Sequence, residues 1–539
     1  MATAACSHPR ARRVSSISIP DVDAGCRVPT TSASSSRSSG ASAAPHLTLT
    51  TIDRVAELTG GRLVGAVGAS QVHLHDVTHD SRATGPGVLF ACRPGAVTDG
   101  HDFAADAVGR GSPALLVERE LALQVPQVQV ESVAQRLGAV AAAVHGHPSE
   151  RLAVAGVTGT NGKTTSAMLL EAVLGAAGMR TGVIGTVGTR SGAREIPGVR
   201  TTPESTDLQR LFRQMLTDGV QAVAMEVSSH GLHLGRLNGT RFAVVAFTNL
   251  THDHLDFHHT MEAYFAAKAQ LFTPGFSPAG VINVDDPWGA RLASQAQIPI
   301  TTVSSGGAPA ADVVATDVRT SATGSAVTVR IRGRSFQVEV GLPGRFNVSN
   351  ALLVLAASDV LGIETAVAAE ALRTPPLVPG RMERVDEGQP FTVLVDYAHT
   401  PDSLQRVLEA TREMTGGGRV IVVVGCGGER DRQKRPAMGA AAAAGADLAI
   451  FTNDNPRSEE PDVILEAIAQ GARTVTDGQW SIEPDRRTAI QQALRTAGPG
   501  DAVVIAGKGH ETGQQLGDRT IAFDDREVAR TLLRDGTGQ

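Results

Sequence analysis

The residues of this chain that could do chemistry start with a glycine-containing stretch at positions 159–165. Its sequence is Gly159-Thr160-Asn161-Gly162-Lys163-Thr164-Thr165. Glycines let backbone N–H groups turn toward an anion, a lysine supplies a positive charge, and a threonine hydroxyl can ligate Mg²⁺. The strict pattern G-x-x-x-x-G-K-[ST] is not met, because its first glycine would fall on Val157 and the glycine lies one residue earlier. The stretch still predicts a nucleotide phosphate site, with an ordinary strand-to-helix turn as the alternative.

An acid and a histidine-rich segment could complete a metal site. Glu226 follows an apolar run, and the carboxyl end of a parallel strand is where open α/β sheets place ligands. Glu226 could therefore hold a metal that Thr164 contacts, or it could be a solvated acid. The segment 252–259 contains four histidines and nearly matches the H-x-H-x-D-H ligand set of binuclear metallohydrolases, but Phe257 replaces the last histidine. One imidazole at a Mg²⁺ site is the more economical interpretation, with the other histidines at the surface or behind the ligands.

Two further polar residues have both a structural and a functional interpretation. Lys268 lies among small and apolar residues in 266–272, which predicts a helix, and residue types alone favour an ammonium that reaches water past its aliphatic stem. The segment Asp80-Ser81-Arg82 precedes Pro86-Gly87 and has the composition of a turn before a buried strand. Ligand binding is the alternative for this turn.

Apolar runs predict the strands and helices that must position these residues. The run 152–157 predicts a buried strand and 166–174 a helix, so the glycine stretch joins the two. Further strands are predicted at 181–185, within 222–230 and at 242–250. A strand, a glycine loop and a helix in this order form a phosphate cradle at the positive end of the helix dipole. This part of the chain therefore predicts a mostly parallel sheet that contains a P-loop.

The last third of the chain predicts a doubly wound, Rossmann-like sheet. Its strands are expected at 392–396, 420–424, 448–451 and 502–506. The polar loops after them are Asp396-Tyr397-Ala398-His399, Gly425-Cys426-Gly427-Gly428-Glu429-Arg430, Asp454-Asn455-Pro456-Arg457 and Gly507-Lys508-Gly509-His510-Glu511. Four such loops at one edge of a sheet predict a site for a zwitterionic or polyanionic ligand.

Length and composition favour a multidomain α/β protein of the cytoplasm. Of the 539 residues, 1–46 are predicted to be a disordered extension, with an organelle transit peptide as the alternative. We expect a small α/β domain at 47–148, a central nucleotide-binding domain at 149–373 and a C-terminal domain at 374–539. The net charge of -6 does not indicate the basic surface that binds nucleic acid. No apolar run approaches the ~18–20 residues that span a bilayer. The four cysteines lack C-x-x-C spacing, which argues against disulfides and structural zinc.

Several motifs together resemble those of the Mur ligase family, in order and spacing, over nearly everything after residue 47. They are Thr158-Gly159-Thr160-Asn161-Gly162-Lys163-Thr164-Thr165, Glu226-Val227-Ser228-Ser229-His230, Thr248-Asn249-Leu250 with Asp253-His254-Leu255-Asp256, Gly344-Arg345-Phe346-Asn347, Asp396-Tyr397-Ala398-His399-Thr400-Pro401 and Gly507-Lys508-Gly509-His510-Glu511. The resemblance implies an ATP-dependent amide ligase of peptidoglycan biosynthesis. Its expected reaction joins meso-2,6-diaminopimelate to the D-glutamate γ-carboxylate of UDP-N-acetylmuramoyl-L-alanyl-D-glutamate through an acyl phosphate.

The resemblance also implies a role for each matching residue. ATP would contact the stretch 159–165, with Asn347 near the adenine. The residues implied to contact the UDP-muramoyl dipeptide are Ser81, Thr201, Thr202, Ser228 and Arg236. Two Mg²⁺ ions would be held by Thr164, Glu226, His254 and Lys268, the last as a carbamate, and Lys163 would join the last three as a catalytic group. One departure is Leu234, which lies where some relatives have a substrate-contacting glutamine.

The segment Asp454-Asn455-Pro456-Arg457 resembles the motif of the family branch that selects diaminopimelate over L-lysine. Diaminopimelate differs from lysine by a distal carboxylate, and a guanidinium can bind a carboxylate bidentately. We therefore expect Arg457, helped by Arg430, to pair with that carboxylate. The residues expected to hold the distal ammonium and the backbone of the ligand are Asp454, Asn455, Gly507 and Glu511, beside Pro456. Lysine would leave the arginine unpaired, at a cost of order ~1–3 kcal/mol or more.

Other interpretations remain open at this stage. The chain could be an L-lysine-adding or folylpolyglutamate synthetase-like ligase, or an inactive scaffold with the same fold. The diaminopimelate-type motif argues against the first two. Retention of Lys163, Glu226, His254 and Lys268 argues against the scaffold, since binding alone needs no two-metal site. A monomer without nucleic-acid partners or membrane insertion is expected.

Overall fold

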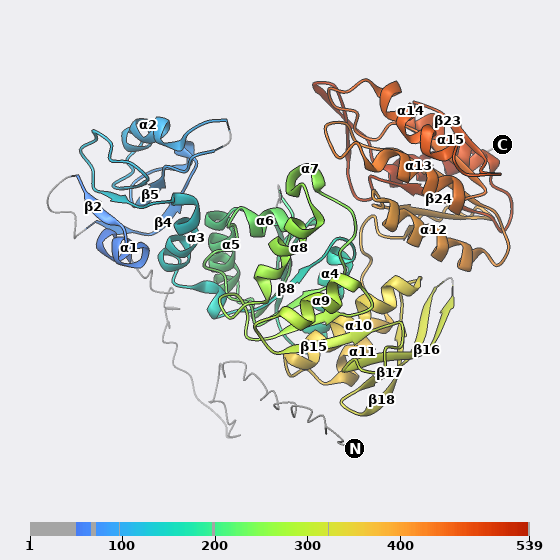
Figure 1. Ribbon diagram of the computed structural model, residues 1–539, viewed down its shortest axis with the longest axis horizontal. Coiled ribbons are helices and arrows are strands. Elements are labelled where there is room, and N and C mark those ends of the chain that lie inside the picture. The colour runs from blue at the N-terminus through green and yellow to red at the C-terminus, as the bar shows by residue number, and fades with distance from the viewer. Residues whose placement is uncertain (1–49, 66–71, 96, 197–199, 322, 537–539) are drawn as a thin grey trace, which may run out of the picture.

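The computed structural model describes residues 50–65, 72–95, 97–196, 200–321 and 323–536. These residues form three α/β bodies that follow one another in chain order across the molecule (Figure 1). We refer to them as the N-terminal body (Thr50–Glu150), the central body (Ala153–Arg373) and the C-terminal body (Glu383–Gly536). The extension predicted at 1–46 lies outside the described residues. In the described part of the chain, no helix has the length and apolar character needed to cross a membrane.

The N-terminal body is built on a five-stranded sheet in the order β2-β7-β6-β5-β4. Its strands are β2 (Arg62–Val64), β4 (Asp76–Thr78), β5 (Val88–Ala91), β6 (Leu115–Val117) and β7 (Gln127–Gln129), and β1 (Thr50–Thr51) pairs separately with β3 (His73–Leu74). Helices α1 (Ile52–Thr59) and α3 (Val133–Val144) share a hydrophobic core with one face of the sheet, and α2 (Ala104–Gly109) shares one with the other. The short helix η2 (Ser81–Ala83) follows β4 directly and carries Ser81.

The central body is built on an eleven-stranded sheet in the order β11-β10-β9-β12-β8-β13-β14-β15-β16-β17-β18. Its strands are β8 (Ala153–Thr158), β9 (Thr181–Gly185), β10 (Gly188–Ser191), β11 (Arg194–Ile196), β12 (Ala222–Glu226), β13 (Val244–Phe247), β14 (Gly280–Asn283), β15 (Ile300–Ser304), β16 (Val313–Ser321), β17 (Gly324–Ile331) and β18 (Arg334–Val340). The seven neighbouring strands β9-β12-β8-β13-β14-β15-β16 pair in parallel, and antiparallel strands extend both edges. The mostly parallel central sheet is therefore confirmed.

Helices cover both faces of the central sheet. The helices on one face are α4 (Lys163–Ala176), α10 (Arg345–Val360) and α11 (Thr365–Arg373). Those on the other are α5 (Ser205–Thr217), α6 (Ser229–His233), α8 (Met261–Ala269) and α9 (Pro287–Gln295). Because both faces are buried, the parallel strands are continuous apolar runs without polar alternation.

The C-terminal body is doubly wound, as the sequence predicts. Its six-stranded sheet has the order β19-β20-β24-β21-β22-β23, with strands β19 (Glu383–Arg384), β20 (Thr392–Asp396), β21 (Val420–Val424), β22 (Leu448–Phe451), β23 (Trp480–Ile482) and β24 (Ala502–Ala506). Helices α12 (Pro401–Thr415), α13 (Lys434–Gly445) and α14 (Pro461–Ala472) pack on one face. Helices α15 (Arg486–Thr496) and α16 (Asp525–Gly536) pack on the other. The four predicted loops follow the carboxyl ends of β20, β21, β22 and β24.

Candidate active site

The glycine stretch joins β8 to α4 and needs its glycines for close approach. Gly159 and Gly162 have φ of 145° and 88°, values that L side chains rarely adopt. A Cβ on Gly159 would lie 1.9 Å from Oγ1 of Thr248, and one on Gly162 would lie 2.4 Å from Oδ1 of Asn350. The loop can therefore fold tightly at the N-terminus of α4, where backbone N–H groups favour an anion.

Lys163 lies at the first position of α4 and folds back over this loop. Its Nζ donates hydrogen bonds to the carbonyl oxygens of Gly159, at 3.0 Å, and Thr160, at 2.8 Å. Burial lowers the pKa of its ammonium, although the charges of Glu226 and Asp253 oppose this shift. A bound phosphate would supply the counter-charge that this cation lacks.

Glu226 ends β12 beside the phosphate loop and is 1% exposed. Its Oε2 accepts a hydrogen bond from the Thr164 hydroxyl at 3.0 Å. Both the backbone N–H, at 2.7 Å, and the hydroxyl, at 3.1 Å, of Thr186 also donate to this carboxylate. Arg381 reaches in from beyond the central body and donates to Oγ1 of Thr164 at 3.1 Å. Thr186 and Arg381 were not predicted; their only sequence signal is that one follows a strand and the other a proline–glycine break.

His254 lies at the start of a short helix, α7 (Leu255–His258), in the left-handed conformation with φ of 55°. Its ring packs edge-on against that of His230, with centroids 4.9 Å apart. Burial lowers the pKa of His254, which keeps the imidazole neutral and able to offer a lone pair. His258 is buried and bonds to Oγ of Ser229 at 2.9 Å, so it is a packed core histidine.

Lys268 is buried on α8, 1% exposed, so the expectation that its ammonium reaches water is wrong. Its Nζ donates to the carbonyl oxygen of Gly159 at 2.8 Å and lies 4.9 Å from the ring centroid of Tyr264. Burial, reinforced by the charge of Lys163, places the pKa of Lys268 well below its usual value. A neutral amine is thereby favoured beside the phosphate loop. The small residues around Lys268 in the sequence did not indicate that its side chain would be buried.

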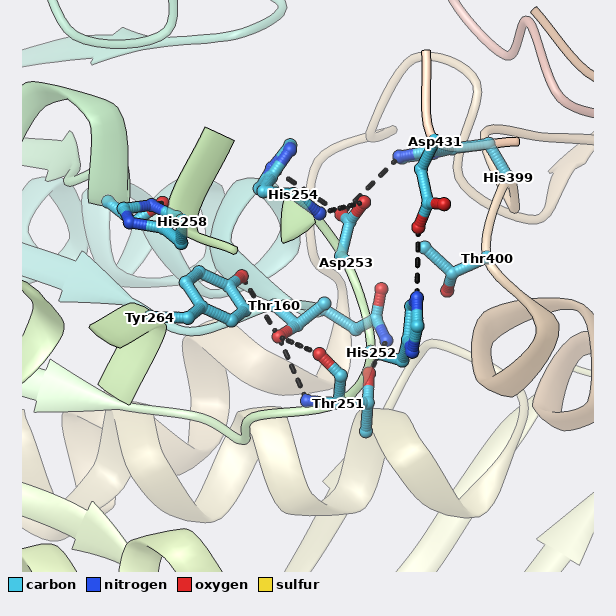
Figure 2. Close-up of polar contacts among 12 residues, drawn as sticks. Thr160, Thr251, His252, Asp253, His254, His258, Tyr264, His399, Thr400 and Asp431 are labelled. Carbon is cyan, nitrogen blue, oxygen red and sulfur yellow. Dashed lines mark hydrogen bonds and ion pairs between the residues drawn. The ribbon is translucent and has the colours of Figure 1, made fainter. Parts of the chain in front are cut away.

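The segment 251–254 connects the phosphate loop to the C-terminal body (Figure 2). The Thr160 hydroxyl accepts from the backbone N–H of Thr251 at 3.0 Å and lies 3.1 Å from the hydroxyl of Tyr264. One residue further, Nε2 of His252 lies 2.9 Å from Oδ2 of Asp431. A second contact between the bodies joins Nδ2 of Asn161 to Asp402 at 3.0 Å.

One cavity of about 430 Å³ collects most of the predicted residues between the central and C-terminal bodies. Its predicted lining residues are Thr160, Asn161, Gly162, Lys163, Thr164, Thr165, Thr201, Glu226, Ser228, His254, Lys268 and Asn347. The C-terminal body contributes the loop 396–399. Asn347 is fixed by donating to the carbonyl oxygen of Pro343 at 2.8 Å. The cavity therefore joins the phosphate loop to residues expected to contact two different substrates.

Of the residues expected to contact the muramoyl dipeptide, Thr201 and Ser228 line this cavity, and Thr202 and Arg236 are hydrogen-bonded beside them. The hydroxyls of Thr201 and Thr186 lie 3.0 Å apart, and Thr202 accepts from the backbone N–H of Ser228 at 3.0 Å. Arg236 donates to the carbonyl oxygen of Thr202 at 3.3 Å, and its Nε lies 2.9 Å from Glu204. Four of the five residues are therefore gathered at one place.

Ser81 lies apart from this group, on the N-terminal body. Arg93 of that body pairs with Glu204 of the central body at 2.8 Å. Arg210 on α5 pairs with Asp76 on β4 at 3.0 Å. These ion pairs fix the turn that carries Ser81 relative to the central body, and Glu204 was not predicted.

The loops of the C-terminal body form a second cluster. Nζ of Lys508 lies 3.4 Å from Oδ1 of Asp454, 3.2 Å from Oδ1 of Asn455 and 3.1 Å from Oε2 of Glu511. Asn455 also donates to Glu511 at 3.1 Å. The predicted Asp454, Asn455 and Glu511 are thus brought together, around a lysine that was not predicted.

The two predicted arginines lie beside this cluster, close to Gly427. A Cβ on Gly427 would lie 3.0 Å from Nη1 of Arg457 and 3.6 Å from Cγ of Arg430. Arg457 donates to the carbonyl oxygen of Gly428 at 2.7 Å and has a left-handed φ of 54°. Its backbone therefore departs from the usual strand or helix geometry at the point where selectivity is expected.

Comparison with known families assigns the class of this protein. The Mur ligase family, catalytic domain matches residues 73–153, the Mur ligase middle domain matches 157–358, and the Mur ligase, glutamate ligase domain matches 380–509. The chain belongs to the Mur ligase family.

Individual relatives narrow this class. A Streptomyces coelicolor protein named UDP-N-acetylmuramoyl-L-alanyl-D-glutamate--2,6-diaminopimelate ligase is 47% identical over 471 residues, covering 86% of this chain and 93% of that protein. A Geobacillus thermodenitrificans protein of the same name is 47% identical over 466 residues, covering 85% and 94%. A solved structure of a ligase with this name superposes with a TM-score of 0.65 at 32% identity, covering 90% of this chain and 99% of that one.

Proposed function

We propose that the chain is an ATP-dependent ligase that adds meso-2,6-diaminopimelate to UDP-N-acetylmuramoyl-L-alanyl-D-glutamate in the cytoplasm, during peptidoglycan synthesis. The observation that carries this proposal is the shared cavity. It is lined by the phosphate loop, by Thr201 and Ser228 from the dipeptide side, and by the loop 396–399 of the C-terminal body. A ligase that activates a carboxylate with ATP needs these groups within reach of one another.

The phosphate loop supports the activation step. A carboxylate is a poor acyl donor, so ATP must first convert the D-glutamate γ-carboxylate to an acyl phosphate. Phosphoryl transfer asks mainly for positioning and charge neutralisation. Lys163 and the N-terminus of α4 neutralise charge at the phosphates, and Arg381 brings a further cation to the Thr164 hydroxyl at 3.1 Å. The amine of diaminopimelate then attacks the acyl carbon and phosphate leaves.

The donors around Glu226 fit Mg²⁺. Its carboxylate and the Thr164 hydroxyl are oxygen donors 3.0 Å apart, and Mg²⁺ prefers oxygen ligands. His254 offers a neutral nitrogen in the same cavity. No group of three or more His, Cys, Asp or Glu side chains that could hold a metal occurs among the described residues, so a larger ligand set must use other donors. Bound Mg²⁺ would supply charge neutralisation at the phosphates.

Lys268 fits the metal set only after modification. An ammonium repels a cation, whereas a carbamate is an anion with two oxygen donors. Carbamate formation requires a neutral amine to attack CO₂, and the buried position of Lys268 favours the neutral amine. We therefore propose that Lys268 acts as a carbamate.

The C-terminal cluster supports diaminopimelate as the incoming amino acid. Nη1 of Arg457, Cγ of Arg430 and the main-chain oxygen of Asn455 all lie within 4 Å of the position of a Cβ on Gly427, and Asn455 donates to Glu511, so Arg457 lies next to the acidic cluster. A ligand with both a distal carboxylate and a distal ammonium matches this pair of charges. L-Lysine lacks the carboxylate, which would leave the arginines without their partner.

Phosphate release tests the proposal directly. We expect release from ATP to require both UDP-N-acetylmuramoyl-L-alanyl-D-glutamate and meso-2,6-diaminopimelate, with mass spectrometry identifying the tripeptide product. Omission of either substrate is the internal control. Equal turnover with L-lysine would assign the chain to the lysine-adding branch. ATP turnover that is just as fast when no amino acid is present would refute the ligase assignment.

A further inference from the structure

Lys508 is the buried centre of the cluster in which diaminopimelate is expected to bind. Its side chain is 0% exposed, whereas those of Asp454 and Glu511 are 13% and 35% exposed. The two acids therefore face the ligand side and Lys508 lies behind them. Because its Nζ contacts oxygens of three neighbours at 3.1 to 3.4 Å, the chain itself places one ammonium beside the two acids, which leaves one negative charge for a ligand ammonium.

We propose that Lys508 is a specificity-determining positioning residue, which offsets one of the two acidic charges and so favours the zwitterionic diaminopimelate over L-lysine, which carries a net positive charge. The inference rests on the proposed function and deepens it. Without Lys508, the two negative charges of Asp454 and Glu511 would attract a net cation more strongly. With Lys508 in place one of these charges is offset, and the distal carboxylate of the ligand, which is expected to pair with Arg457, contributes more to the preference.

The charges around the cluster support a difference between the two ligands. At neutral pH, diaminopimelate carries two ammonium and two carboxylate groups, whereas L-lysine carries two ammonium groups and one carboxylate. A fixed positive charge behind the acids attracts the additional carboxylate and disfavours the net cation. Arg486 also lies near Asp454 and Glu511, but it is paired with Asp525 at 2.7 Å. Lys508 is therefore the cation bonded directly to the acids.

A merely structural lysine would behave differently from a selective one. Loss of a structural contact lowers turnover with both amino acids in proportion. Loss of the positive charge lowers the preference between them, because the net cation L-lysine is then attracted more strongly, whereas the distal carboxylate of diaminopimelate loses an attraction. The ratio of the two kcat/KM values separates these cases.

The test replaces Lys508 by Met, which keeps the aliphatic stem and removes the charge. We expect the ratio of kcat/KM for diaminopimelate to that for L-lysine to fall about tenfold or more, as expected for one charge acting across several ångströms of partly screened protein. Arg419→Met is the control, since this cation of the same body pairs with Asp501 outside the cluster. Its ratio should stay at the wild-type value.

A double variant tests the charge argument against a packing effect. Lys508→Met with Glu511→Gln removes one charge of each sign, so the ratio should recover toward the wild-type value even if turnover is low. A further fall in the ratio would overturn the proposal, as would an unchanged ratio in folded Lys508→Met. If Lys508→Met does not fold, Lys508→Gln, which retains hydrogen-bond donors without the charge, gives the same comparison. Wild-type turnover that needs no diaminopimelate would instead refute the proposed function itself.

Discussion

Asp76 offers a quantitative test of how the N-terminal body is held in place. Its carboxylate lies 3.0 Å from Nε of Arg210 on the central body and 3.2 Å from Nε2 of His145. Burial disfavours the charged carboxylate, but the nearby His145 imidazole and the hydrogen bonds from Arg210 outweigh burial and lower the pKa from 3.8 to about 2. This difference corresponds to ~2 kcal/mol of stabilisation when the carboxylate is charged.

The sign of the pH dependence follows from the lowered pKa. A carboxyl group of this kind stabilises the folded state above pH ~4, and the contribution disappears as the pH falls toward ~2. Asp76→Asn should therefore lower the free energy of unfolding by ~2 kcal/mol at pH 7, and the difference from wild type should shrink below pH ~4. Denaturant unfolding followed by circular dichroism at pH 7, 5, 4 and 3 measures this difference.

A functional readout accompanies the stability measurement, because Asp76 begins β4, the strand that leads into the turn carrying Ser81. We expect KM for the UDP-muramoyl dipeptide to rise severalfold in Asp76→Asn, with little change in KM for ATP. Asp106→Asn is the matched control, since its pair with Arg110 is about half exposed and contributes little. Identical unfolding curves for Asp76→Asn and wild type across this pH range would refute the reasoning.

Three further predictions concern the other bodies. Lys268→Ala should lower ligation by ~10²–10³-fold, with partial rescue by short carboxylic acids that replace the carbamate, and absence of any loss in a phosphate-release assay would remove the carbamate proposal. Arg457→Ala should lose most of its preference for diaminopimelate over L-lysine in competition assays, and full retention would reassign the carboxylate partner. His252→Ala should lower kcat severalfold by removing the contact with Asp431, whereas His252→Gln, which keeps an N–H donor, should retain more activity; equal losses would show that this contact does not align the two bodies.

The sequence predicts best those elements whose residues are buried on both faces. Strands β9, β20, β21, β22 and β24 have the bounds expected from their apolar runs, because a parallel strand between two helical layers tolerates few polar residues. The phosphate loop could be predicted equally well from the sequence. Its glycines are required by the local backbone conformation, and Lys163 follows them directly. The doubly wound C-terminal sheet could be predicted from the same two kinds of signal, namely apolar runs for the strands and the loops that follow them.

The remaining features depend on contacts between distant parts of the chain. His252 and Asp431 are 179 residues apart, and nothing in either segment indicates that they meet. The burial of Lys268 could not be predicted because small and apolar neighbours fit both a surface helix and a core one. Lys508 lies in a predicted loop, but its place behind Asp454 and Glu511 depends on how two separate loops converge.

The cavity shared by the central and C-terminal bodies has a bearing on inhibitor design. A compound that fills it binds only molecules whose two bodies have this spacing, so if one molecule in ten has it, the apparent affinity falls about tenfold, or ~1.4 kcal/mol. A screen against an isolated body would present only part of the cavity wall. Resistance could then arise at the contact between Asn161 and Asp402, through a change in the spacing of the two bodies.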